Sequence, residues 1–208
     1  MARAYGEAAI PKGRHGLAPD AVAAQQRERV FSAIVELVAE HGYRHTSIDQ
    51  IVKSAQVGYG AFYDLFAGKE DCFVAAFDRI AEETSQALLG AVAGEQAWPH
   101  QISAALACLV KLLIEHPQRA RLALVEVHAA GPRARGRYEN ALDTATPKLR
   151  EGRAWKPRAT RLTPALEGAV VGGAAWIIHQ RLLEGDLKET EPLLEELLEI
   201  VVAPYISE

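Results

Sequence analysis

The feature that most constrains this 208-residue chain is a pair of short segments within 46–66, each with an apolar face at helical spacing. The first segment covers 48–55 and the second covers 58–66, and only Gln56 and Val57 connect them. Two short helices joined by a tight turn, with a steadying helix before them, are the geometry of a helix-turn-helix. A plain helical hairpin in a bundle has the same periodicity, so the spacing by itself leaves both interpretations open.

The periodicity outside this unit is also helical, without an alternating strand pattern or an internal repeat. Asp20 can cap a helix that runs to about His41, where Gly42 ends it. We therefore expect an all-α fold of about nine helices. The helices expected after the unit cover 69–90, 102–115, 117–130, 131–152, 164–184 and 191–202, and a loop is expected over 153–163.

The composition is that of an ordinary globular protein, with 49% hydrophobic and 24% charged residues. No apolar run approaches the length of about 20 residues that a membrane span needs. The first residues also lack the apolar core of a signal peptide, so a cytoplasmic location is expected. Cys72 and Cys108 form no CxxC pair and suggest neither a disulfide nor a zinc site. We expect both to be buried, unreactive thiols.

The net charge of −4 and the pI near 6.0 weigh slightly against nucleic-acid binding, for which a basic face is expected. The cations, however, gather locally. Arg3, Lys12 and Arg14 precede the first helix, and three more flank the 46–66 unit. The acidic surplus lies later, for example over 189–199. The three flanking cations are Arg44, Lys53 and Lys69. The overall charge therefore neither excludes DNA nor argues for it.

Catalytic motifs are missing from the sequence. The seven histidines form no HExxH pattern, and no Ser-His-Asp or phosphate-loop spacing occurs. The carboxylate pairs Glu82-Glu83 and Glu195-Glu196 are sequence neighbours, so they point in different directions on a helix. We expect no catalytic residue, cofactor or metal. Two alternatives stay open: a small all-α enzyme, and a helical protein-interaction module that does not bind DNA.

Four stretches carry a resemblance to a known family. They are His41-Gly42-Tyr43, Thr46-Ser47-Ile48-Asp49-Gln50-Ile51, Ala55-Gln56-Val57-Gly58-Tyr59-Gly60-Ala61-Phe62-Tyr63-Asp64-Leu65-Phe66 and Gly68-Lys69-Glu70-Asp71. With them, residues 27–79 resemble the DNA-binding domain of TetR-type repressors. The arm over 12–17 resembles the N-terminal extension of an actinobacterial-looking subgroup. The resemblance covers about the first third of the chain and implies a transcriptional regulator that binds duplex DNA.

The resemblance implies a role for each matching position. Thr46 and Ser47 would start the first short helix and contact the DNA backbone, since helix N-termini suit phosphate oxygens. Tyr63 and Lys69 would contact phosphates. Arg14 in the arm is a candidate for the adjacent minor groove, as in other helix-turn-helix proteins. The positions at the base-facing start of the recognition helix are Gly58, Tyr59, Gly60 and Ala61, with Asp64 near the groove.

Several of these positions depart from the family's usual residues. Gly58 replaces a capping Ser, at a cost of a few tenths of a kcal/mol. Tyr59 replaces a frequent Lys or Arg, and Asp64 replaces a frequent His. Asp64 could accept from a cytosine amino group or repel the DNA, and Ala61 offers only a methyl group to thymine. We therefore expect few direct base contacts and a larger reliance on backbone contacts and DNA shape.

The sequence divides into a flexible basic arm (1–19), a helix-turn-helix domain (20–68) and a larger helical domain (69–208). In TetR-like proteins the last part dimerises and encloses an effector. The ranges 164–184 and 191–202 carry broad apolar faces, as helices of an intersubunit four-helix bundle would. Packing within one subunit is the alternative. A homodimer would present two recognition helices to a palindromic operator.

Aromatic side chains with a few polar atoms are typical of small-molecule sites, and the larger domain offers several. The resemblance implies that an effector there would shift the 69–90 helix and re-space the two DNA-binding heads. The resulting hypothesis is a ligand-responsive regulator, a repressor that an unknown small molecule releases from DNA. The candidate effector-binding residues are Trp98, His128, Tyr138, Trp155, Trp176 and His179.

Overall fold

The computed structural model describes residues 19–155, 163–187 and 189–206. These residues form ten α-helices and two short 3-10 helices without a strand, so the all-α prediction is confirmed. The basic arm with Arg14, and most of the expected 153–163 loop, lie outside the described residues. The α-helices are α1 (Pro19–His41), α2 (Ile48–Ser54), α3 (Tyr59–Leu65), α4 (Lys69–Val92), α5 (Trp98–Glu115), α6 (Pro117–Leu124), α7 (Pro132–Asp143), α8 (Thr146–Glu151), α9 (Pro164–Glu184) and α10 (Thr190–Ile206), and the 3-10 helices are η1 (Glu126–His128) and η2 (Gly152–Ala154).

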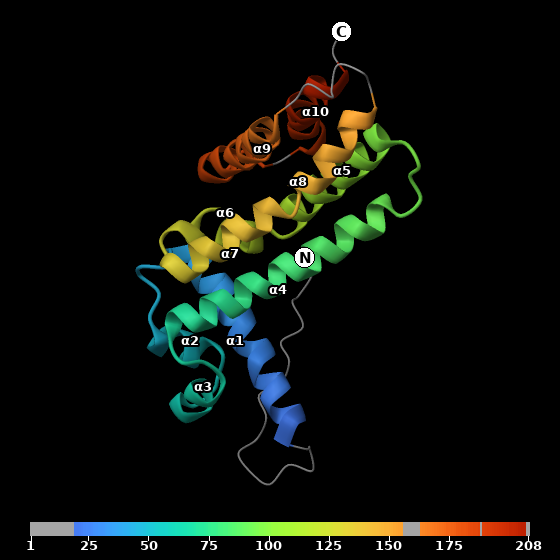
Figure 1. Ribbon diagram of the computed structural model, residues 1–208. Coiled ribbons are helices and arrows are strands. Elements are labelled where there is room, and N and C mark those ends of the chain that lie inside the picture. Colours follow the sequence, from blue (N-terminus) through green and yellow to red (C-terminus); the bar gives the residue numbers. More distant parts are fainter. Residues whose placement is uncertain (1–18, 156–162, 188, 207–208) are drawn as a thin grey trace.

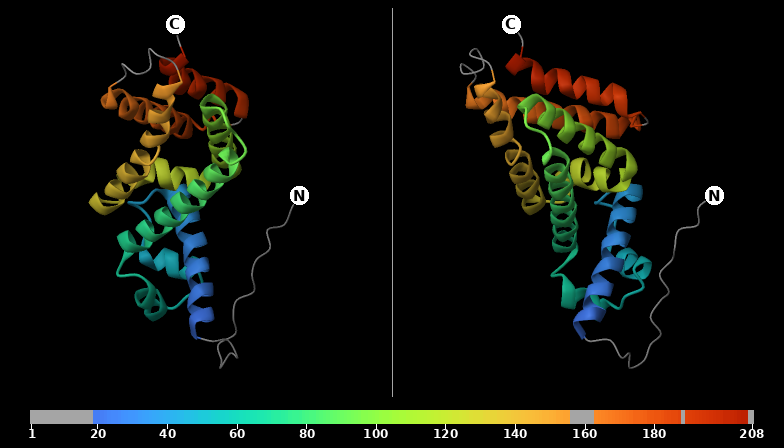
Figure 2. Two further views of the ribbon diagram at one scale, coloured as in Figure 1. Left: turned by 45° about the vertical axis from the view of Figure 1, so that its right-hand side comes forward. Right: turned by 90° about the vertical axis from the view of Figure 1, so that its right-hand side faces the viewer.

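The described helices form an elongated molecule with two ends of different construction. Helices α1, α2 and α3 make one end, and α9 and α10 make the other (Figure 1). The long helix α4 begins beside α3 and runs toward the opposite end, where α5 packs against both α4 and α10 (Figure 2). We call α1–α3 the head and α5–α10 the upper domain. Helix α4 therefore connects the two.

Local sequence signals explain how the head begins. Helix α1 starts at Pro19, so Asp20 lies in its first turn rather than at its cap. Gly42 has φ +79°, a left-handed conformation that glycine adopts without a Cβ penalty, and α1 ends there as predicted. The next helix, α2, starts with a capping box in which Ser47 Oγ accepts from Gln50 N and Gln50 Oε1 accepts from Ser47 N.

A single apolar cluster holds the head and extends beyond it. It includes Val30 and Ile34 of α1, Phe62 of α3 and Phe73 of α4, all fully buried. Side chains of α6, η1 and α7 belong to the same cluster, so the packing continues across the expected boundary between residues 68 and 69. The upper-domain members of this cluster are Leu122, Val127, Ala130 and Ala134. The head is therefore packed directly against part of the upper domain.

Two further apolar clusters build the upper domain. One gathers Trp98, Leu149 and Tyr205 from α5, α8 and α10, and the other gathers Val110 and Leu197 from α5 and α10. Both clusters also contain residues of α9. The interior of this domain is thus filled by side chains from helices far apart in the sequence.

The helix bounds differ from the expected ones most clearly over 98–152, and α10 also continues to Ile206 instead of ending at 202. The range 117–130 is divided into α6 and η1, and 131–152 is divided into α7 and α8. Pro147 explains the second break, because it has no N–H to bond the carbonyl of Asp143. Helix α5 starts at Trp98 rather than at 102, with Pro99 in its first turn, where a missing N–H costs nothing. The expected 164–184 helix has the bounds of α9.

Candidate nucleic-acid interface and effector groove

The packing of α3 leaves its outer face open. Phe62 is fully buried and Phe66 is nearly so, and both lie on the seam with the buried Ile51 and Val52 of α2. The apolar faces that the sequence predicts for the two short helices thus meet in one seam. On the opposite face, the side chains of Tyr59 and Tyr63 are 50% and 55% exposed. A helix held by one face with its aromatic residues free on the other can enter a groove of DNA.

Tyr59 is fixed by a contact that the sequence does not reveal. Its hydroxyl donates to Asp49 Oδ1 of α2 at 2.8 Å, and Lys53 Nζ lies 2.8 Å from Asp49 Oδ2. The hydrogen bonds from Lys53 and Tyr59 lower the pKa of Asp49, and the bond to Asp49 raises the pKa of Tyr59. The ring of Tyr59 is therefore tied to α2, at the surface where α2 and α3 meet.

Two expected phosphate contacts have internal partners instead. Thr46 is only 1% exposed, and its hydroxyl donates to Gly42 O at 2.9 Å. Lys69 Nζ donates to Tyr43 O and to Thr46 O, both at 2.9 Å, and lies 4.1 Å from the centre of the Tyr43 ring. Burial lowers the pKa of Lys69. Both side chains hold the turn between α1 and α2, and their roles at phosphate stay predictions.

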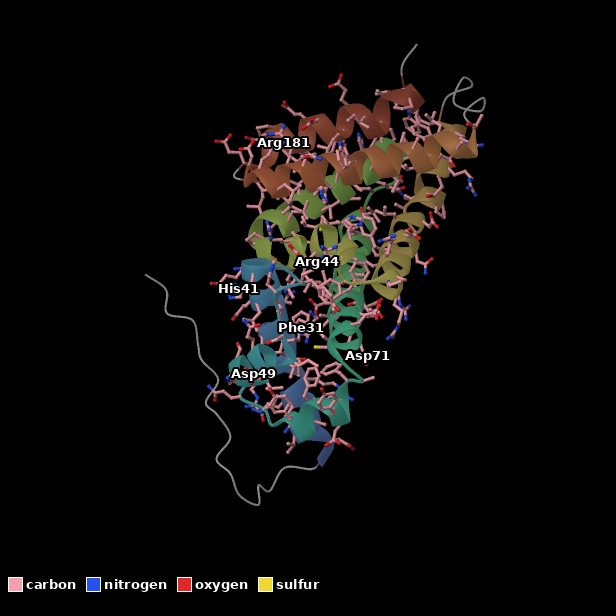
Figure 3. All side chains as sticks on the ribbon, turned by 90° about the vertical axis from the view of Figure 1, so that its left-hand side faces the viewer. Phe31, His41, Arg44, Asp49, Asp71 and Arg181 are labelled. Atoms are coloured by element: carbon pink, nitrogen blue, oxygen red, sulfur yellow. The ribbon has the colours of Figure 1, made fainter. Side chains whose placement is uncertain are left out.

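The remaining expected positions are accessible. Ser47, Gly58, Gly60 and Asp64 are exposed, and Ala61 is half-buried. Gly58 is the N-cap of α3 and supplies no side-chain cap, as its sequence position predicts. Sequence reasoning gave Arg44 no contact role, yet it is exposed in the turn between α1 and α2. Figure 3 shows Asp49 in the lower part of the molecule and Arg44 near its middle, both below Arg181 on α9.

Four of the six expected effector-site residues come together in the upper domain. The rings follow one another in the order Tyr138, His128, His179 and Trp176, with centroid distances of 5.0, 5.7 and 5.8 Å. With Gly172 and Ala175 they line an open groove of about 460 Å³. We call this the aromatic groove. It joins η1, α7 and α9, which are far apart in the sequence.

The lining of the aromatic groove contains no Asp, Glu, Lys or Arg among the described residues. Burial lowers the pKa of His128, assisted by His179 and Arg135, so its neutral form is favoured. Burial raises the pKa of Tyr138. His179 Nδ1 lies 2.8 Å from Leu124 O, and because a carbonyl only accepts, this nitrogen carries a proton. The groove thus combines aromatic walls with a few polar atoms.

The other two expected residues lie elsewhere. Trp98 is buried, donates from Nε1 to Lys148 O at 2.8 Å, and packs against Tyr205 with ring centroids 4.8 Å apart. Trp155 follows η2 and is about half exposed. Their roles in ligand binding stay predictions, but neither lines the aromatic groove.

Helix α9 also has an exposed apolar side. Trp176 is 62% exposed and Leu183 is 50% exposed. Gly168, Ala169 and Gly172 are exposed on the same helix and leave its backbone approachable. A contiguous patch of exposed apolar side chains is the kind of surface that marks a protein interaction site.

Helix α3 packs on α2 and α1 by one face and leaves its other face exposed. This arrangement defines the class of this chain: it is a helix-turn-helix DNA-binding protein. Residues 30–76 match the model of bacterial regulatory proteins of the tetR family. This segment therefore belongs to the TetR family of transcriptional regulators, which are transcription factors rather than enzymes.

Solved structures show the same fold over almost the whole chain. The fatty acid degradation regulator FadR of Bacillus halodurans is 16% identical with a TM-score of 0.76, covering 85% of this chain and 94% of its own. FadR of Bacillus subtilis, solved with stearoyl-CoA, is 18% identical with a TM-score of 0.72 and coverages of 85% and 98%. A TetR family regulator of Marinobacter aquaeolei VT8 is 20% identical, with a TM-score of 0.69 and coverages of 89% and 97%. A search of curated protein sequences gives no match.

The described part of the chain holds no group of three or more His, Cys, Asp or Glu side chains placed to bind a metal ion. Among the same residues, no helix combines the length and the apolar character that crossing a membrane requires. Cys72 is buried as predicted, and burial raises the pKa of its thiol to about 12. Cys108 is only half-buried.

Proposed function

We propose that this regulator binds a palindromic operator as a homodimer, represses transcription there, and is released when a small molecule occupies the upper domain. The observation that carries the DNA-binding part of the proposal is the open face of α3 on a rigid seam. The effector and dimer parts rest on the aromatic groove and on the exposed side of α9.

Exposed groups around α3 support the DNA contacts. Tyr63 is free to donate its hydroxyl to a phosphate, and Ser47 stands at the N-terminus of α2, where unpaired amides favour anions. Arg44 is an exposed cation in the turn that leads to this helix. Tyr59 would meet the DNA groove with its ring, because its hydroxyl is already bonded to Asp49. With Gly60 and Ala61 beside it, such a face reads few base edges and depends on DNA shape.

The exposed side of α9 supports the dimer. A two-fold axis beside α9 would bury Trp176 and Leu183 of both subunits, and small residues at Gly168 and Gly172 would let the two helices approach closely. Interfaces of homodimers are richer in apolar and aromatic residues than the rest of the surface. The two heads would then face successive major grooves of one operator.

The aromatic groove supports control by a ligand. FadR of B. subtilis forms a complex with stearoyl-CoA, and the present chain shares its fold. Long-chain acyl-CoA thioesters are therefore the first compounds to test. A ligand weakens DNA binding only to the extent that it binds the DNA-free conformation better than the DNA-bound one.

Selection of binding sites from a random duplex library tests the proposal. We expect enrichment of a palindrome bound by two subunits. We also expect Tyr59→Ala to reduce affinity for it and to change the preference at the bases nearest α3. A Tyr59→Phe variant separates the ring from the hydroxyl and should retain the preference. If no duplex is enriched, or if Tyr59→Ala retains both affinity and preference, the reading role of this face is wrong.

A further inference from the structure

The segment 124–128 is held from two sides. On the upper side, His179 of α9 bonds Leu124 O through Nδ1 at 2.8 Å. On the head side, the carboxylate of Glu126 accepts from Tyr43 N at 2.9 Å, across 83 residues of sequence. Only Val125 separates the two bonded residues. A very short stretch of backbone therefore joins the contact with α9 to the contact with the head.

The apolar side chains of the segment divide in the same way. Leu124 and Val125 pack against the upper-domain cluster that contains Val110 and Leu197. Val127, fully buried, belongs to the cluster of the head. His128 then turns its ring to Tyr138 and His179 in the aromatic groove. The segment is therefore packed into both halves of the molecule and lines the groove at its end.

The bond of Glu126 reaches the backbone that sets the position of α2. Tyr43 is bound on both sides, because Glu126 accepts from its N–H while Lys69 Nζ donates to its carbonyl. Lys69 also binds Thr46 O, the residue before the Ser47 cap. Gly42 leaves room for this arrangement, since a Cβ there would lie 3.3 Å from Glu126 Oε2. The carboxylate itself is nearly buried, with Arg121 Nη2 at 3.7 Å.

From this geometry we propose that Glu126 is the positioning residue that couples α9 and the aromatic groove to the helix-turn-helix. The proposal rests on the proposed function, because it names the connection through which an occupied groove acts on the head. The carboxylate fixes Tyr43, Tyr43 and Lys69 fix the start of α2, and α2 carries α3. A shift of His179 or His128 moves Leu124 and Glu126 together and changes the position of the reading helix.

Native-state amide hydrogen exchange at Tyr43 tests the coupling without a ligand or DNA. The variant Glu126→Ala removes the charged acceptor of the Tyr43 N–H. Hydrogen exchange at the Tyr43 amide should then become faster by about tenfold or more, relative to exchange at the Val110 amide of α5. Glu126→Gln keeps a carbonyl acceptor and should restore most of the protection. His179→Ala, far from Tyr43, should also accelerate exchange at Tyr43. Combined with Glu126→Ala, it should add nothing.

Two control variants test whether the effect is specific to Glu126 and His179. Glu139→Ala on α7 and His100→Ala on α5 remove exposed side chains of the same types and should leave Tyr43 exchange unchanged. His179→Ala should alter affinity for the selected duplex only when Glu126 is present. Unchanged Tyr43 exchange in His179→Ala, or additive effects of the two substitutions, would overturn the coupling. If the wild type binds no duplex, the proposed function is wrong. Tyr43 hydrogen exchange in the two single variants and the double variant still tests the coupling through Glu126.

Discussion

Tyr59 shows how a single residue acquires a role through a distant partner. The sequence predicts an exposed aromatic residue at the start of the recognition helix, and that exposure is found. The hydroxyl bond to Asp49 spans the turn between α2 and α3, and no periodicity signals it. A polar contact across a turn depends on the exact angle between the helices, which the apolar pattern of each helix does not specify.

Thr46 and Lys69 illustrate the opposite case. Their positions match the family pattern, and the resemblance implies phosphate contacts for both. In the structure their polar atoms bind backbone carbonyls of the turn after α1. Backbone carbonyls that a helix end leaves free need donors, and this demand is invisible in the side-chain sequence.

Glu167 offers a prediction at the same scale. It is fully buried in the first turn of α9, with Arg153 Nε at 2.7 Å from Oε1 and Arg150 Nε at 3.3 Å from Oε2. Glu167→Ala should lower the free energy of unfolding by about 3 kcal/mol, because it leaves Arg153 without its anionic partner in a largely buried site. Urea denaturation measures the loss. Glu199→Ala, an exposed carboxylate on α10, should change stability little. Equal effects of the two variants would contradict the structural role of Glu167.

At the scale of elements, most helices could be predicted because their apolar faces repeat over many residues. The bounds of α9 and the position of the turn at Gly42 follow directly from proline and glycine. The division of 117–130 into α6 and η1 could not be predicted. It depends on Val127 turning into the core of the head while Leu124 stays in the upper domain. Such a tertiary demand overrides local helix preference.

The junction of α8 and η2 gives a prediction for an element. A Cβ at Gly152 would overlap the ring of Trp98, which is held in place by Lys148 O and Tyr205. Gly152→Ala should therefore destabilise the protein by about 1 to 3 kcal/mol, as overpacked cores do. Gly136→Ala in α7 meets open space and should stabilise by about 0.5 to 1 kcal/mol. Thermal unfolding of both variants decides this, and a stabilised Gly152→Ala would show that the contact is absent.

At the scale of the whole molecule, the head and the upper domain share one apolar cluster. The sequence places a boundary between 68 and 69, because Ala67 and Gly68 end the second short helix and Lys69 opens a long one. The packing of Leu122 and Val127 into the head's cluster is a long-range property that no local signal carries. It gives the upper domain direct contact with the DNA-binding unit, in addition to the connection through α4.

The proposed dimer can be tested with two exposed leucines. Leu183→Glu places a charge on the exposed side of α9 and should produce monomers in sedimentation velocity, because a buried unpaired carboxylate is strongly unfavourable at an interface. Leu89→Glu on α4 is the matched control, since Leu89 is also well exposed but lies away from α9. A dimer that persists in Leu183→Glu, or that dissociates in Leu89→Glu instead, would place the interface elsewhere.

The face formed by α3 and the start of α2 is the surface that we propose binds duplex DNA. The most direct measurement is the salt dependence of affinity for the selected duplex, because neutralised phosphates release counterions. For the wild type we predict a steep loss of affinity with rising salt. For Arg44→Ala we predict weaker binding to all duplexes and a salt slope reduced by about 1. Affinity independent of salt, or an Arg44→Ala variant with the wild-type slope, would contradict this placement of the interface.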